Sequence, residues 1–197
     1  MRFTAKIFLS VLLLMPSLAS AQFSESYNFL KAVRDRDGNE ATKIISKPGS
    51  VIIDTKDSTT GESALHIVTA ARDTTWMSFL LYKGAKADTR DARGNTPLMI
   101  TAQIGFVEGA QLLLNKRASV DLTNSAGETP LIRAVQNRNA AMVQLLVQAG
   151  ANPKKADNGA GLSALDYATR DRRAAAILKI LQEAKASAVP KASGPKL

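Results

Sequence analysis

Histidine, the side chain most often used for proton transfer near neutral pH, occurs once in the 197 residues, at His66, and cysteine does not occur. A nucleophile activated by a histidine base would therefore depend entirely on His66. Without cysteine, the sequence excludes a thiolate nucleophile, a disulfide and a Cys-based metal site. Any transition-metal site would have to use oxygen ligands.

Pairs of aspartates are the second set of residues that could do chemistry. General acid–base catalysis by two carboxyl groups needs a pocket that pushes their pKa values apart. These pairs lie in predicted turns and loops, where Asp caps helices and stabilises turns, so we expect exposed side chains of ordinary acidity. The spacing of oxygen ligands in a calcium loop and a glycine-rich phosphate loop are both missing. The sequence thus predicts a protein that is not an enzyme and that binds no metal or cofactor. The pairs are Asp35 and Asp37, Asp54 and Asp57, and Asp88 and Asp91.

Basic residues exceed acidic ones by 26 to 17, which gives a net charge of +9. Such an excess favours an acidic partner or an anionic surface, mainly through the encounter rate. Aromatic residues are too sparse to interleave with the charges as base-stacking platforms would. We therefore expect a protein partner, with an acidic one favoured, and no nucleic acid.

The first 21 residues have the three parts of a secretory signal peptide: a basic start, the apolar run 7–15, and small residues at Ala19 and Ala21. A membrane anchor is the alternative, but about nine apolar residues fall short of the roughly 20 that span a bilayer. We expect cleavage after Ala21, a mature chain with no transmembrane segment, and a periplasmic location.

A repeated sequence motif indicates which structural elements position these residues. The sequence G-N-T-P-L at Gly94 recurs as G-E-T-P-L at Gly127, with looser copies at Gly61 and Gly161, at spacings of 33, 33 and 34 residues. A period of that length is typical of a stacked array in which each unit contacts only its neighbours.

The unit that begins at Gly94 illustrates the expected pattern. Thr96 can cap a helix and Pro97 tolerates its first position, so we predict a helix of about eight residues that ends at Gly105. A second helix is predicted over 107–115, followed by an extended polar finger over 121–126.

These units resemble ankyrin repeats, whose consensus contains G-x-T-P-L-H-x-A-A and a closing G-A-D. The closest matches are 96–98 and 129–131, and further matches are Gly84-Ala85 and 150–152. The resemblance covers residues 27–184 and implies an all-α ankyrin-repeat solenoid, elongated and with a concave face. It also implies that His66 forms a structural hydrogen bond to the adjacent finger. The expected division is a signal peptide (1–21), an ankyrin-repeat domain (22–184, with units 27–60, 61–93, 94–126, 127–160 and 161–184) and a disordered basic tail (185–197).

Some units depart from the consensus. The unit from Tyr27 lacks a T-P-L entry, as an N-terminal cap would, and the connection from Gly49 to Gly61 is two residues longer than its counterpart, which predicts a longer first finger. The last unit has a polar exterior, as an uncovered end requires. Trp76 is interpreted as a core residue. Arg117 stands where other units have a helix-ending glycine, which predicts a left-handed residue.

The resemblance also implies a partner-binding surface, since ankyrin repeats generally bind with their finger tips and with exposed positions of the first helices. Alternatively, several of the isoleucines pack between repeats and leave only polar tips exposed. The predicted binding residues are Ile67, Ile100, Gln103, Ile104, Arg133, Gln136, Asn137, Tyr167 and Arg170 on the helices, with Arg90, Arg93 and Asn124 on the fingers.

These observations favour a monomeric, non-catalytic periplasmic module that binds or shields another exported protein. An inhibitor or immunity protein that neutralises a toxin or enzyme in the same compartment is the alternative. An enzyme is the least favoured interpretation.

Overall fold

The computed structural model describes residues 16–48 and 50–187, with the backbone alone for residues 16–24 and 185–187. In this part of the chain, ten α-helices form pairs, and the first helix of each pair is here called inner and the second outer. The inner helices are α1 (Pro16–Arg34), α3 (Ala64–Ala70), α5 (Pro97–Ile104), α7 (Pro130–Gln136) and α9 (Ala164–Arg170). The outer helices are α2 (Gly38–Ile45), α4 (Thr74–Tyr82), α6 (Val107–Asn115), α8 (Ala140–Gln148) and α10 (Ala175–Ser187).

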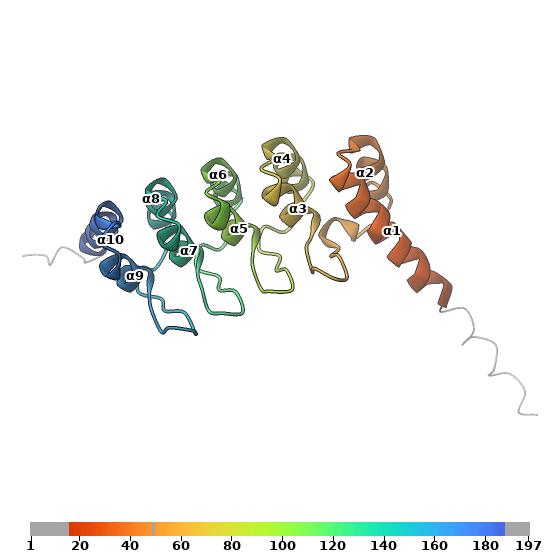
Figure 1. The fold of residues 1–197 in the computed structure, drawn as a ribbon. Helices are drawn as coiled ribbons and strands as arrows, with labels where there is room; N and C mark the ends of the chain where they lie inside the picture. Colours follow the sequence, from red (N-terminus) through yellow and green to blue (C-terminus); the bar gives the residue numbers. More distant parts are fainter. Residues whose placement is uncertain (1–15, 49, 188–197) are drawn as a thin grey trace, which may run out of the picture.

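The helix pairs stand side by side in one row, and the finger loops between them project together to one side (Figure 1). Each inner helix packs on the next inner helix, and from α4 onward each outer helix packs on the next outer helix. The described residues contain two isolated β-bridges and no strand. The predicted all-α solenoid of five helix-turn-helix units is therefore confirmed.

Local signals set the helix ends where the sequence places them. The Thr96 hydroxyl accepts a hydrogen bond from the backbone N–H of Met99 at 3.3 Å, and Pro97 occupies the first turn. The helix ends at Gly105, whose φ of 67° is left-handed. The predicted limits of α5 and α6 are confirmed because these signals act within one unit.

One continuous core runs the length of the row. Leu98, Leu113, Leu131 and Leu146 from successive helices are fully buried in it. Trp76 is half-buried against this core and meets Phe79 edge-on, with ring centroids 5.5 Å apart, so it packs against the core rather than lying inside it as a core residue would.

Successive fingers are joined by backbone hydrogen bonds. The N–H of Ala92 donates to the carbonyl of Thr60 at 3.0 Å, that of Ser125 to Arg93 at 3.0 Å, and that of Asn158 to Ala126 at 2.9 Å. This close approach requires glycine at the finger tips, because a Cβ atom on Gly94 would lie 2.9 Å from the backbone nitrogen of Ser125. The fingers thus form a second, hydrogen-bonded row beside the helices.

The ends of the row differ from its middle. The longer first connection contains a short 3₁₀-helix, η1 (Ile52–Asp54). Helix α1 begins at Pro16 and continues past Ala21, the last residue of the predicted signal peptide, while residues 1–15 lie outside the described part. Helix α10 continues to Ser187, and residues 188–197 of the expected disordered tail are likewise outside it. Among the described residues, no helix is both long enough and apolar enough to cross a membrane.

Candidate binding surface

The single histidine is buried at the start of α3 and holds two units together. Its Nδ1 accepts a hydrogen bond from the backbone N–H of Ser63 at 3.2 Å, and its Nε2 lies 3.0 Å from the carbonyl oxygen of Asn95 in the next finger. Only the neutral ring with its proton on Nε2 satisfies both contacts. Burial lowers the pKa of His66 and favours this form. The implied structural hydrogen bond to the adjacent finger is confirmed.

The Ser63–His66 arrangement has the composition of a nucleophile and base, with Oγ 2.8 Å from Nδ1. Both residues are almost completely buried, so a substrate has no access to them. The last unit repeats the arrangement with Asp166, whose carboxylate accepts from the Ser163 hydroxyl at 2.6 Å and from its N–H at 2.9 Å. Because an aspartate does the same work there, we assign the pair to helix capping.

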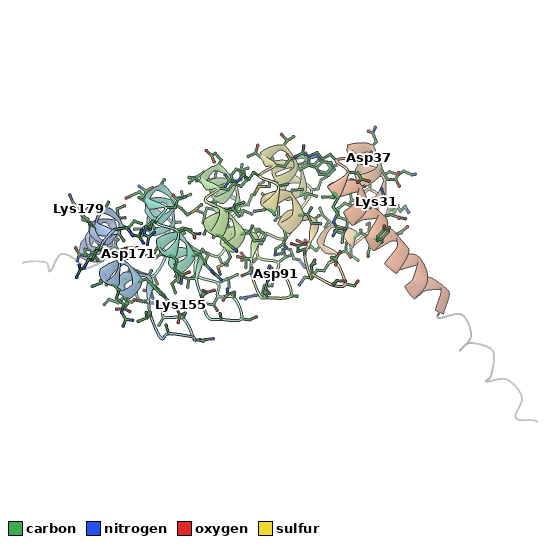
Figure 2. All side chains as sticks on the ribbon, in the orientation of Figure 1. Lys31, Asp37, Asp91, Lys155, Asp171 and Lys179 are labelled. Atoms are coloured by element: carbon green, nitrogen blue, oxygen red, sulfur yellow. The ribbon has the colours of Figure 1, made fainter. Side chains whose placement is uncertain are left out.

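Aspartates of the three pairs also stabilise the fold, by accepting hydrogen bonds from the finger loops. Asp88 accepts hydrogen bonds from the N–H and hydroxyl of Ser119, at 2.9 and 2.5 Å, and so links two units. Asp91 closes its own finger by accepting from the N–H groups of Arg93 and Asn95, both at 2.8 Å (Figure 2). Hydrogen bonds from the N–H groups of Thr60 and Thr59, together with Arg34, lower the pKa of Asp57 to about 2.

The contacts of Asp57 keep its carboxylate ionised, whereas a general acid needs a raised pKa. In the part of the chain that the structure describes, no three His, Asp or Glu side chains are grouped as metal ligands would be.

The isoleucines predicted for the binding surface are half-buried. Ile67 and Ile104 pack against the core, and Ile100 is partly exposed on α5. The structure therefore gives Ile67 and Ile104 a share in the packing of the core, and leaves only part of each of the three residues accessible to a partner.

Several predicted polar residues are held by neighbouring units. The amide of Asn137 donates to the carbonyls of Ala102 and Gln103, at 3.3 and 2.7 Å, and so caps the end of α5. The guanidinium of Arg90 donates to the carbonyls of Gly94, at 3.2 Å, and Thr123. These side chains stabilise the stack before any partner binds.

Arg133 and Asn124 meet at Glu128, at the end of the third finger. The Arg133 guanidinium lies 2.6 Å from the Glu128 carboxylate, which also accepts a hydrogen bond from the Asn124 amide at 2.7 Å. The Nε atom of Arg133 is buried and has no hydrogen-bond partner among the described residues. Sequence reasoning placed Arg133 at this face but did not identify its acidic partner.

A shallow hollow lies between α7 and α9 on the same face. Its lining includes the predicted residues Gln136, Tyr167 and Arg170. The Tyr167 hydroxyl donates to Asp157 at 2.6 Å, which raises the pKa of the tyrosine and lowers that of the aspartate. The Arg170 guanidinium has no hydrogen bond or ion pair within 4 Å to another described residue, but after the hydrogen bonds from Ser163 its charge also helps to lower the pKa of Asp166, one turn earlier on α9. Gln136 is exposed, and its side chain is hydrogen-bonded to that of Tyr167.

Residues 29–124 and 116–191 each match the family model described as ankyrin repeats (3 copies). The chain belongs to the ankyrin-repeat family. Ankyrin repeats are generally non-catalytic modules for protein–protein interaction, and this role agrees with a surface whose histidine and carboxylates serve the fold.

Within the ankyrin stack, five of the predicted residues are exposed: Gln103, Gln136 and Arg170 on inner helices, Asn137 directly after α7, and Arg93 on a finger. Sequence reasoning missed Arg138, which also lines the hollow and is ion-paired at 2.5 Å with Asp171, the residue labelled in Figure 2. A signal was present, since Arg138 stands 33 residues after Gly105, at the same turn of the next repeat.

Proposed function

We propose that this ankyrin stack is an exported adaptor that binds or shields another exported protein, and that an acidic segment of the partner docks in the hollow between α7 and α9. The observation that carries the proposal is the exposed Arg170, which has no ion-pair partner within 4 Å among the described residues, beside the exposed Gln136 amide. The basic start, apolar run and small residues of the first 21 positions support export.

The charges around the hollow favour an acidic partner. Asp171 is bound to Arg138, and hydrogen bonds from the Arg173 N–H and the Arg138 guanidinium lower the pKa of its carboxyl group. Asp157 is bound to the Tyr167 hydroxyl. Asp166, one turn before Arg170 on α9, accepts hydrogen bonds from the N–H and hydroxyl of Ser163. Because these acids have local partners, Arg170 can bind a carboxylate from outside, and Gln136 offers both a donor and an acceptor to a peptide backbone.

Site-specific photocrosslinking tests the surface. A photoreactive residue at Gln136 should give a covalent adduct with one partner in cells, and Arg170→Glu should reduce the adduct at least about tenfold by like-charge repulsion. The matched control places the photoreactive residue at Gln144, which is exposed on outer helix α8. The same adduct from both positions, or an adduct insensitive to Arg170→Glu, would reject this surface.

Export is tested separately. We expect the purified mature protein to begin at Gln22 and to be released with the periplasmic fraction. An N-terminus at Met1 would contradict export but would leave the crosslinking result valid. If the crosslinked partner is an enzyme that loses activity on binding, the adaptor acts as an inhibitor.

A further inference from the structure

A cationic edge follows the outer helices, away from the hollow between α7 and α9. Lys83 and Lys116 are the residues directly after α4 and α6, which pack side by side. Arg117 follows Lys116, and these two line a shallow hollow together with Lys86 from the preceding turn. We call these four residues, with Tyr82 and Val51, the turn edge.

The carboxylates beside the turn edge already have partners. Asp88, in the same hollow, is bound to the N–H and hydroxyl of Ser119. Asp54 accepts from the N–H of Lys86 at 2.9 Å, whereas the ammonium of Lys86 is 3.7 Å away on a side chain that is 78% exposed. Neither Lys116 nor Arg117 has an ion-pair partner among the described residues.

Part of this positive charge has a structural explanation. A cation at a helix C-terminus offsets the partial negative charge of the helix dipole, and both Lys83 and Lys116 stand at such ends. The ammonium of Lys83 also lies 5.9 Å from the ring centre of Phe79. Arg117 directly follows Lys116 and is also close to the end of α6, whereas Lys86 lies beyond the helix ends, so the dipole does not account for Lys86.

Two apolar side chains are exposed in the same part of the chain: one adjoins Lys83, and the other lies three residues before Asp54, which binds the N–H of Lys86. Tyr82, next to Lys83, is 79% exposed, and Val51, in the connection between α2 and η1, is 73% exposed. In the part of the chain that the structure describes, only Tyr27 joins them as a large exposed hydrophobic residue. Tyrosine beside lysine and arginine is typical of protein surfaces that lie at the headgroup level of a membrane.

We propose that the turn edge binds the surface of an anionic phospholipid membrane, with its cations on headgroup phosphates and with Tyr82 and Val51 in the headgroup layer. A membrane fits better than a folded acidic protein, because the cations extend over successive turns and line only a shallow hollow. Membrane binding through the turn edge, which follows α4 and α6, leaves the hollow between α7 and α9 open to a protein partner.

Single-cysteine labelling tests where the membrane touches, and the absence of native cysteine makes the label specific. An environment-sensitive fluorophore on Asn115→Cys, at the end of α6, should shift to the blue when the full chain meets vesicles of phosphatidylglycerol and phosphatidylethanolamine. The same dye on Gln103→Cys, on inner helix α5, should not shift. Shifts at both positions or at neither would overturn the proposal.

Charge variants test the cations. The triple variant Lys86→Gln, Lys116→Gln and Arg117→Gln should bind these vesicles at least about tenfold more weakly, because each lysine or arginine near an anionic surface contributes about a factor of five. The control triple Arg172→Gln, Arg173→Gln and Lys179→Gln removes as much charge from the last unit and should bind like the wild type. Circular dichroism checks both folds.

Equal losses in the two triples would show a general charge effect and overturn the proposal. Unchanged vesicle binding in the first triple would overturn it as well. A third result would also overturn it: the first triple binds immobilised polyglutamate more weakly than the wild type, and the fluorophore on Asn115→Cys does not shift with vesicles. That result would assign the turn edge to an acidic protein.

Discussion

At the scale of single residues, left-handed arginines connect the units. Three of them close the turn between an inner and an outer helix and reach the next unit. Arg36 pairs with Asp73 at 3.0 Å, Arg72 donates to the Ile104 carbonyl and lies 5.7 Å from the ring centre of Phe106, and Arg138 pairs with Asp171 at 2.5 Å. Arg117, with φ of 61°, has the same backbone but ends an outer helix and lacks such a contact among the described residues.

Arg117→Gly should therefore stabilise the protein. A left-handed conformation costs a non-glycine residue about 1 kcal/mol, and the greater freedom of glycine in the unfolded chain offsets part of the gain. We expect the midpoint of thermal unfolding to rise by about 1–3 °C. Arg138→Gly is the control, since it relieves the same backbone but loses the ion pair with Asp171, and its midpoint should not rise. A midpoint for Arg117→Gly at or below that of the wild type would contradict the assignment.

His66 should make stability depend on pH. Its pKa lies below the ordinary value of 6.5 in the folded protein, so below pH 6.5 the unfolded state binds more protons. The free energy of unfolding must then fall as the pH drops below 6.5. His66→Gln is the matched variant, because glutamine can accept the same Ser63 N–H bond without titrating.

Urea unfolding between pH 7.5 and 5 measures this effect. The wild type should lose more stability than His66→Gln over the acidic part of that range, and the difference between the two should be constant above it. Parallel pH profiles would show that His66 keeps its ordinary pKa after folding.

At the scale of elements, the finger row depends on how closely one finger approaches the next. A Cβ on Gly127 would lie 2.7 Å from the backbone nitrogen of Asn158 and 2.5 Å from its side chain. Gly161 occupies the same finger position in the last unit, with a similar left-handed φ of 66° against 76°, but a Cβ there meets nothing within 4 Å.

Alanine at these two glycines separates backbone strain from collision. Gly161→Ala should destabilise by about 1 kcal/mol through the left-handed backbone alone. Gly127→Ala should cost a further 1–3 kcal/mol, roughly that of overpacking, because it drives two fingers apart. Chemical denaturation of both variants gives the difference, and equal losses would mean that the fingers can separate freely.

The sequence predicted the elements better than the site because of where the signals act. Thr96, Pro97 and Gly105 define α5 through contacts inside one unit, so the limits of that helix could be predicted. The amide of Asn137 and the guanidinium of Arg90 reach backbone carbonyls 33–35 residues away. The residue type does not show that such a side chain is already hydrogen-bonded to another unit. The predicted binding residues, chosen by their position in the repeat, therefore include both side chains that are free to bind a partner and side chains that are not.

At the scale of the whole molecule, units near the middle have a neighbour on both sides and the end units have one. The third residue of the inner helix also differs between the middle and the ends. In α5 and α7 it is a fully buried apolar residue, Met99 or Ile132, whereas α3 and α9 have His66 and Asp166 there. In a stack whose stability is a sum of unit and interface terms, the middle should open last.

Hydrogen exchange followed by mass spectrometry can measure this gradient. Amides of α5 and α7 should exchange most slowly, and those of α1 and α9 faster.

Leu131→Ala removes a fully buried side chain of α7 and should cost about 2–5 kcal/mol of folding stability. Because coupling passes through interfaces, exchange should rise in α7 and in its packing partners α5, α8 and α9, and α2 should change little. Gln144→Ala on the exposed side of α8 is the control and should leave the pattern intact. A uniform rise along the whole chain after Leu131→Ala would instead mean that the row unfolds as one cooperative block, so that the stability of the binding hollow depends on every unit equally.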